Sequence, residues 1–295
     1  MNHTLELAGL REDNPRDFLA ALGLLRMLEV IFASTHPRLA WDQSRGIPTI
    51  STICQLSEDF ASHVWQRACQ ISHGSKPTLE PTRVLSVSSS DLRAKLETLM
   101  LAESRLDIAI LTSISSQLDV EGQSRRSEFI IESGQIIPLK GICESLANET
   151  YQQTLSAALM GLAEPIKLKH TPRWNPAEFR SAAYTTTDPA KTDFFDHPTL
   201  NVLAFIGLSF FPVVDSSRGA TTTGISRATG EKCFSWPLWE TPLTSAEIGT
   251  LLLLPEVHAA ELNHPLLQKI GIHRVWKTRK FGDANNKYFS TAMPA

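Results

Sequence analysis

The amino-acid sequence predicts a mixed α+β fold, with a helix-rich N-terminal half that carries a small sheet and a C-terminal half built of a helix and antiparallel hairpins. In residues 1–163 apolar residues recur mostly at helical spacing, whereas residues 164–295 contain short alternating segments around turn residues. Between 161 and 176 the chain changes character, with three prolines in a basic and aromatic stretch. We therefore place a boundary between a region 1–163 and a region 164–295, although the two can also be read as one continuous unit.

The composition is that of a globular protein, with 42% hydrophobic and 20% charged residues among 295. It excludes neither an enzyme nor a binding module. No basic segment followed by an apolar run opens the chain, and no apolar stretch reaches the roughly 20 residues that span a bilayer, so we expect a cytoplasmic protein with no membrane partner. Cys54, Cys69, Cys143 and Cys233 lie too far apart to suggest a zinc site or a disulfide framework, and we predict no cofactor.

The opening segment contains clear local signals. Residues 4–7 alternate in polarity as a strand does. Asn14 can cap a helix that begins with Pro15, and Asp17 then lies in the first turn, where the helix dipole favours a carboxylate. Apolar residues follow near helical spacing as far as Phe32. We interpret this segment as a core strand and helix, because it offers no nucleophile and its turn lacks the second glycine of a dinucleotide-binding loop.

The same patterns predict the remaining elements in order. In the N-terminal region we expect strands at 38–41 and 49–53, helices at 57–71 and 91–106, a loop at 74–90, a polar stretch at 113–127, a strand at 128–131 and a long helix at about 139–160. In the C-terminal region we expect a strand at about 180–186, a loop at 187–193, a helix after 196–198, a hairpin of 221–225 with 232–236, and two strands within 270–289. Thr244 and Glu247 form a capping-box sequence that opens an apolar helix at 248–254.

Four blocks of sequence, in order along the chain, carry a family resemblance. They are TLELAGLREDNPRDFLAALGLLRMLEVIF at 4–32, SEFIIESGQ at 127–135, RWNPAEFR and DPAKT within 173–192, and LAFIGL, FP, TTG and FSWPLW within 203–239. Together they resemble the accessory proteins of type I-G (formerly I-U) CRISPR operons, including the family described as an extension of the helicase-nuclease. The second block continues into Ile136-Ile137-Pro138, whereas relatives tend to pass directly into a helix that carries aromatic residues, so this chain departs from the family pattern at that point.

The resemblance implies a role in RNA-guided antiviral defense, as a large-subunit-like component of the effector complex or as a protein beside it. The implied partners are CRISPR effector complex subunits together with guide RNA, target DNA or both. In such complexes base pairing reads the sequence, while protein subunits hold the backbone. The resemblance supplies no catalytic residues, so we expect a non-catalytic protein with RNA-binding or DNA-binding activity.

Nucleic-acid contact needs lysine or arginine to neutralise phosphates, and exposed aromatic or arginine planes to stack on bases. Because the net charge is −3, any such surface must be local. The residues predicted to bind phosphate in the basic C-terminal segment are Lys269, Arg274, Lys277, Arg279 and Lys280, interleaved with His273, Trp276, Phe281 and Tyr288. Those predicted in the linker are Lys169 and Arg173, next to His170 and Trp174. A solvated face whose aromatic side chains turn into the core explains either cluster about as well.

A metal-dependent nuclease is the first alternative function. It would need clustered carboxylates with a lysine or histidine, and the densest set is Asp188, Lys191, Asp193, Asp196 and His197. The ordinary interpretation of these residues is turn and helix-cap chemistry. We therefore predict no metal and no catalytic residue there, and we expect Asp196 to act as a cap.

A scaffold that touches only other proteins is the second alternative, with the segment 234–239 as its interface. Pro237 cannot donate to a central strand ladder, which suggests a strand that ends at the surface. If Trp236 points into the core, Trp239 lies beyond the break and is predicted to face a partner, where tryptophan is a common anchor.

Overall fold

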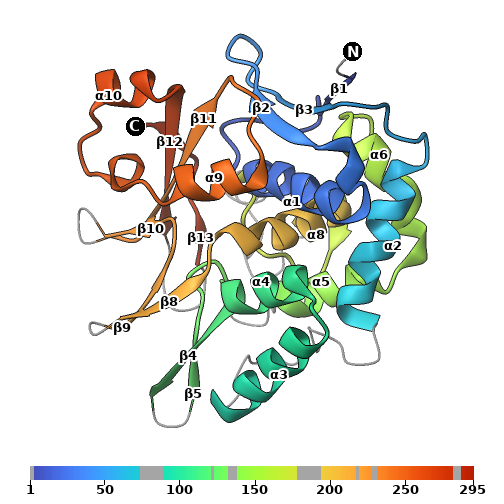
Figure 1. The fold of residues 1–295 in the computed structure, drawn as a ribbon, viewed down its shortest axis with the longest axis vertical. Helices are drawn as coiled ribbons and strands as arrows, with labels where there is room; N and C mark the ends of the chain where they lie inside the picture. The colour runs from blue at the N-terminus through green and yellow to red at the C-terminus, as the bar shows by residue number, and fades with distance from the viewer. Residues whose placement is uncertain are drawn as a thin grey trace, which may run out of the picture.

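The computed structural model confirms the mixed α+β fold, with N-terminal helices and a small sheet followed by a C-terminal antiparallel sheet (Figure 1). The structure describes residues 3–73, 89–120, 123–131, 138–177, 194–216, 219–227, 231–281 and 287–295. No helix within these ranges is long and apolar enough to cross a membrane. The strand predicted at 180–186 and the loop predicted at 187–193 lie outside the described residues.

The N-terminal sheet and the first helix form as the local signals predict. β1 (His3–Glu6), β2 (Arg38–Trp41) and β3 (Pro48–Thr52) make an antiparallel sheet in the order β1-β3-β2. α1 (Pro15–Ile31) follows β1. The side-chain oxygen of Asn14 accepts a 3.0 Å hydrogen bond from the backbone N–H of Arg16, so Asn14 is the expected cap.

Two of the helices predicted in the N-terminal region are interrupted. The observed helices are α2 (Phe60–His73), α3 (Ser89–Leu101), α4 (Arg105–Ile114), α5 (Pro138–Leu146) and α6 (Thr154–Leu159). Glu103 adopts a φ of 53°, which separates α3 from α4 within the predicted helix at 91–106. The single helix predicted at 139–160 is wrong, because the chain leaves the helix after Leu146 and Asn148 caps a separate 3-10 turn, Glu149–Gln153, that leads into α6.

The strand predicted at 128–131 is also wrong. The chain turns there, closed by a 3.1 Å hydrogen bond from Ile130 N–H to the Ser127 carbonyl. The strand lies earlier, as β5 (Gln123–Arg126), which pairs with β4 (Ser115–Val120). The polar stretch at 113–127 is therefore largely a hairpin, and the turn after it places Phe129 in the core.

The C-terminal region is built from hairpins around one larger sheet. β6 (Ile166–Leu168) pairs with β7 (Phe194–Asp196), and β8 (Val213–Ser216) pairs with β9 (Gly219–Thr222). The larger sheet has the order β10 (Ile225–Ser226), β11 (Cys233–Trp239), β12 (Ile272–Phe281) and β13 (Tyr288–Phe289), with β14 (Met293–Pro294) also paired to β12. α8 (Pro198–Gly207), α9 (Ser245–Leu252) and α10 (His264–Lys269) are the helices of this region. The predicted capping box and final pair of strands correspond to the start of α9 and to β12–β13. The predicted hairpin of 221–225 with 232–236 is only partly present, because Thr221 and Thr222 belong to β9 and pair with β8, and only Ile225 pairs with β11.

α1 and α8 pack against each other at the centre of the molecule (Figure 1). Gly23 and Gly207 lie where the helices cross. A Cβ on Gly23 would come within 1.9 Å of the Leu203 carbonyl oxygen, and a Cβ on Gly207 within 2.0 Å of the Leu19 carbonyl oxygen. The two helices are therefore in backbone contact, which only glycine at these two positions allows.

The apolar core runs across the boundary predicted at 163. Phe129 makes an edge-to-face contact with Phe234 at 4.9 Å between ring centroids, and Phe18 lies 5.9 Å from the ring of Trp236. These rings come from segments far apart in sequence and belong to one buried cluster. The division into two regions stays a prediction, with a shared core between them.

Candidate nucleic-acid interface

β12 carries most of the cations predicted to bind phosphate, and its register separates them onto two faces. Trp276 lies opposite Trp236 of β11, and Lys277 lies opposite Ser235. Successive side chains of a strand point to opposite faces of the sheet. Arg274 and Lys280 therefore share one face, which we call the inner face, and Lys277, Arg279 and Phe281 share the other, which we call the outer face.

The inner face is balanced by carboxylates from the N-terminal region. Arg274 forms an ion pair with Glu12, across 262 positions of sequence. Lys280 Nζ donates to the carbonyl oxygen of Glu128 at 2.9 Å and to its Oε2 at 3.0 Å, and the Lys280 side chain is only 12% exposed. Both cations already neutralise protein carboxylates in partly buried surroundings. Neither is placed to meet a phosphate without breaking that pair.

Glu128 joins two lysines beneath the sheet. Its Oε1 accepts a 2.6 Å hydrogen bond from Lys232 Nζ, in addition to the bond from Lys280. Burial alone would raise the pKa of the Glu128 carboxyl, but the two ammonium groups outweigh it and hold the pKa below its ordinary value. The carboxylate is therefore ionised at neutral pH and acts as a structural link between β12 and the turn at 127–130.

The outer face combines cations with an open cavity. Lys277 and Arg279 line a cavity of about 370 Å³, together with Ser290, Leu262 and Met293. Lys277 Nζ donates to the Ala259 carbonyl at 3.3 Å. Ser290 lies on the segment after β13, directly beside Arg279, whose backbone N–H donates to the Ser290 hydroxyl at 3.1 Å. Glu261 and the C-terminal residue Ala295 line the same cavity, so two positive side chains and a hydroxyl meet there beside an acidic side chain and the end of the chain.

The ion pair of Arg279 is exposed and therefore weak. Its Nη1 lies 3.1 Å from Glu231 Oε2, with the two side chains 53% and 50% exposed. An exposed pair of this kind contributes only about 0 to 1 kcal/mol, so a phosphate can replace Glu231 at small cost. Two residues further along the same face, Phe281 is exposed and makes an edge-to-face contact with Tyr288 at 5.8 Å. The outer face thus offers cations and an accessible aromatic ring in a row.

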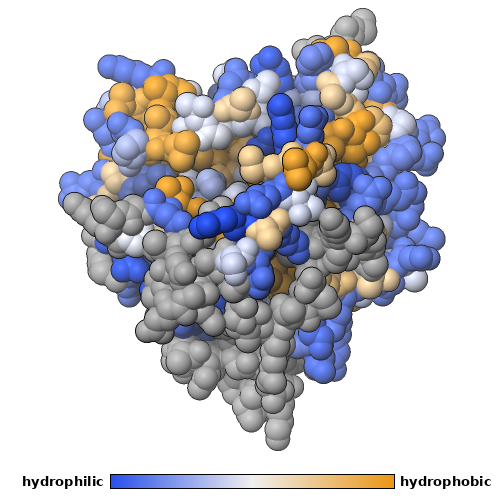
Figure 2. All heavy atoms as spheres, turned by 60° about the horizontal axis from the view of Figure 1, so that its bottom comes forward, coloured by the Kyte–Doolittle hydropathy of each residue, from blue (hydrophilic) through white to orange (hydrophobic). Residues whose placement is uncertain are grey.

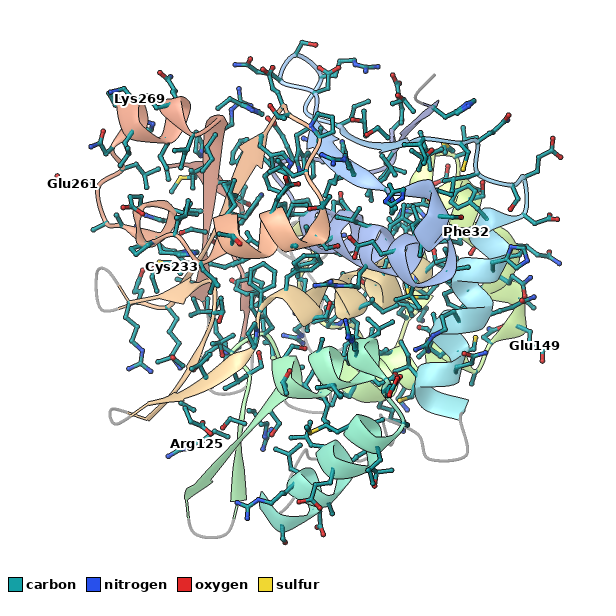
Figure 3. All side chains as sticks on the ribbon, in the orientation of Figure 1. Phe32, Arg125, Glu149, Cys233, Glu261 and Lys269 are labelled. Atoms are coloured by element: carbon teal, nitrogen blue, oxygen red, sulfur yellow. The ribbon has the colours of Figure 1, made fainter. Side chains whose placement is uncertain are left out.

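Lys269 lies apart from this row. It stands at the end of α10, at the top left of Figure 3, well away from Cys233, which pairs with Arg279 in the sheet. Lys269 is exposed, and it makes no ion pair with another residue of the described part of the chain. Of the predicted C-terminal cations, the structure therefore brings Lys277 and Arg279 together and leaves Lys269 separate.

The linker residues are divided between surface and interior. Lys169 is exposed, whereas Arg173 is 3% exposed. Arg173 has a φ of 59°, its guanidinium lies 5.3 Å from the centre of the Phe194 ring, and its Nη1 donates to the Lys287 carbonyl at 3.4 Å. The neighbouring Trp174 is buried and donates its Nε1–H to the Phe129 carbonyl at 2.8 Å. The predicted linker cluster therefore lies mainly in the core. This agrees with the alternative interpretation, in which its aromatic side chains turn into the core.

The prediction that Trp239 faces outward is wrong. The Trp239 side chain is 1% exposed, and its Nε1–H donates to the Leu39 carbonyl at 2.8 Å. The strand does not end at Pro237, because β11 stays paired with β12 from Cys233 to Trp239. On the other side of β11, β10 pairs only with Cys233 and Phe234. Pro237 therefore lies where β11 has an open side, and its missing N–H leaves no ladder bond unmade. The strand continues, and Trp239 packs in the core with no surface for a partner.

Asp196 is not a helix cap. His197 occupies the cap position of α8, whereas the Asp196 side chain is fully buried, forms an ion pair with Arg16 and accepts a 3.0 Å hydrogen bond from Asn175 Nδ2. Arg16 also pairs with Asp17 at 2.5 Å, and burial raises the pKa of the Asp17 carboxyl against the opposing effect of Arg16. We call Arg16, Asp17, Asn175 and Asp196 the buried ionic cluster.

The alternative nuclease site is only partly within the described chain. Asp188, Lys191 and Asp193 lie outside the described residues. Among the residues that are described, no three histidine, cysteine or acidic side chains are grouped so that they could hold a metal ion. Asp196 itself is directed to Arg16, so the described part of the predicted set lacks a carboxylate that faces an open site.

Sequence reasoning missed the residues that decide which cations are available. Glu12, Glu128 and Glu231 pair with the cations of β12, and Ser290 supplies the hydroxyl of the cavity. One signal was present in the sequence. Strand alternation alone puts positions 277, 279 and 281 on one face and positions 274 and 280 on the other. No sequence signal indicates which carboxylate lies against which face.

Comparisons of the chain with protein families, with curated proteins and with solved structures found no match.

Proposed function

We propose that this protein is a non-catalytic nucleic-acid-binding component of an RNA-guided DNA-targeting complex, and that it holds the backbone of guide RNA or target DNA against the outer face of β12. The observation that carries the proposal is the row Lys277, Arg279 and Phe281 beside a cavity lined by Ser290. The effector complex and its subunits are part of the proposal because the sequence blocks resemble those of type I-G CRISPR accessory proteins.

The chemistry of this row suits a flexible single strand. Lys277 and Arg279 can each take one phosphate. Among the described residues, Lys277 is held by a 3.3 Å hydrogen bond to a carbonyl and Arg279 by an exposed ion pair, and both contacts are weak enough to give way. The exposed ring of Phe281 can stack on an unpaired base, an interaction that tolerates any base because every base has a π-face. The proposal therefore predicts affinity with little sequence preference, as expected of a subunit that holds the strand while base pairing reads it.

The test measures binding of a labelled single-stranded RNA and a single-stranded DNA of mixed sequence across a salt series. The double variant Lys277→Ala/Arg279→Ala should weaken binding and reduce the slope of log K against log salt by about 1.4, which corresponds to two phosphate contacts on a single strand. The matched control, Arg11→Ala/Lys140→Ala, removes the same charge from two other exposed ion pairs and should leave the slope unchanged. An equal effect of both double variants, or no effect of either, would refute the site.

The aromatic part of the site has its own measurement. Phe281→Ala removes the exposed ring without changing charge, so the salt slope should stay that of the wild type while affinity falls by about 1 to 3 kcal/mol. A variant that folds normally and binds as tightly as the wild type would mean that bases do not stack at this position.

A further inference from the structure

An apolar groove lies between α9 and α10, away from the cavity beside β12. It encloses about 450 Å³. Its lining residues are Leu243, Glu247, Thr250, Leu251, Leu254, Glu256, Leu266 and Ile270. None of them lines the cavity that Lys277 and Arg279 share. Apolar surface gathers at the upper left of Figure 2, on the side of the molecule that carries α9 and α10 in Figure 1.

The two walls of the groove are helical stripes. Glu247, Thr250, Leu251 and Leu254 follow one another at i, i+3, i+4 and i+7, so they form one ridge along α9 and the turn after it. On the other wall, α10 and its C-terminal cap residue present Leu266 and Ile270 at i and i+4, which are 38% and 43% exposed. Two such ridges leave a channel between them that matches the side-chain ridge of a third helix.

The charged residues that line the groove have one sign. Glu247 and Glu256 are the charged residues that line it, and both are acidic. Glu247 closes the capping box with Thr244 and lies 4.0 Å from Arg38, with both side chains about half exposed. Lys269 precedes Ile270 on α10 but does not line the groove. A phosphate backbone would be repelled by this edge, whereas a cationic partner would be attracted.

We propose that this groove binds an amphipathic helix of a partner protein, with apolar residues at i, i+3, i+4 and i+7 flanked by lysine or arginine. The leucine and isoleucine ridges would take the apolar stripe, and Glu247 and Glu256 would pair with the flanking cations. This protein-binding site is separate from the proposed nucleic-acid site and does not depend on it. The chain therefore has one face for a polyanion and another for a basic helix.

The test uses two designed helical peptides that share one leucine stripe and differ only in flanking charge, with lysine in one and glutamate in the other. Fluorescence anisotropy of each labelled peptide is followed as the full-length protein is added. The lysine peptide should bind at least about tenfold more tightly than the glutamate peptide, because only the former is complementary to Glu247 and Glu256. Equal binding of the two peptides, or binding of neither, would overturn the proposal.

Three variants locate the binding site. Leu266→Asn/Ile270→Asn should weaken binding of the lysine peptide by about tenfold or more. The control Leu253→Asn should leave binding unchanged, because Leu253 is apolar and 62% exposed beside the groove but does not line it. Glu256→Lys should narrow the difference between the two peptides. Wild-type peptide binding by a folded Leu266→Asn/Ile270→Asn variant would overturn the proposal. A wild-type dimer that this variant abolishes would do the same, because it would assign the groove to a second copy of the chain.

Discussion

Asp196→Asn is the perturbation that most directly tests the buried ionic cluster. The Asp196 side chain is fully buried, and that of its partner Arg16 is 5% exposed. The substitution keeps the size of the side chain but removes its charge, so the Arg16 guanidinium keeps the carboxylate of Asp17 and loses that of Asp196. Breaking a buried ion pair on one side costs about 3 to 5 kcal/mol, against about 1 kcal/mol for loss of a helix cap. Because Asp17 stays in place, we expect a loss of about 3 kcal/mol, near the lower end of that range.

Thermal and urea denaturation measure this loss. For a chain of this length, about 3 kcal/mol corresponds to a fall of roughly 5 °C in Tm. The matched control is Asp13→Asn, which breaks the exposed ion pair with Arg11 and should change stability by less than about 1 kcal/mol. If the Asp196→Asn and Asp13→Asn variants have the same Tm, the buried ionic cluster does not stabilise the fold and the reasoning fails.

Three further predictions test other parts of the structure. Trp239→Ala should lower the free energy of unfolding in urea by about 3 to 5 kcal/mol, because it empties a core position and leaves the Leu39 carbonyl without its donor; a loss under about 1 kcal/mol would contradict this core position. Glu128→Gln should lower the free energy of unfolding most above pH 4.5 and progressively less below it, because the pKa of Glu128 is lowered in the folded state and the unfolded chain takes up the proton first as the pH falls. If the difference in unfolding free energy between variant and wild type does not become smaller in acid, the lowered pKa of Glu128 does not contribute to stability. Gly23→Ala should lower Tm because its Cβ would overlap the facing helix, whereas Gly249→Ala in α9, whose Cβ would meet nothing within 4 Å, should raise the free energy of unfolding by about 0.5 to 1 kcal/mol. If both substitutions change stability in the same direction, the close crossing of α1 and α8 is contradicted.

The elements that the sequence predicts well are those decided by adjacent residues. Asn14 with Pro15 starts α1, and Thr244 with Glu247 starts α9, because each capping hydrogen bond joins residues within one turn. The long helix at 139–160 was predicted from apolar spacing alone, which continues across Asn148 although the backbone does not. An internal asparagine that can accept from the N–H two residues later is a competing local signal, and here it prevails.

The candidate site was predictable in its residue types and not in their surroundings. The sequence shows that 269–289 is basic and aromatic, and Lys277 and Arg279 do line a cavity. Arg274 and Lys280 look the same in sequence, yet each meets a glutamate from the first half of the chain. Those partners are 262 and 152 positions away, and no local pattern specifies contacts over such distances.

The glycine crossing of α1 and α8 has a consequence for synthesis of the chain. α1 is buried on nearly all sides, and its closest helical partner begins about 170 residues after it ends. At typical rates of about 5 to 20 residues per second, on the order of 10 to 30 s pass before that partner leaves the ribosome. During this time α1 lacks the partner that covers most of it, although β2 and α2, which also contact it, are made earlier. Chaperones act on exposed apolar segments of this kind. The early appearance of α1 and the late appearance of α8 thus make folding wait for most of the chain.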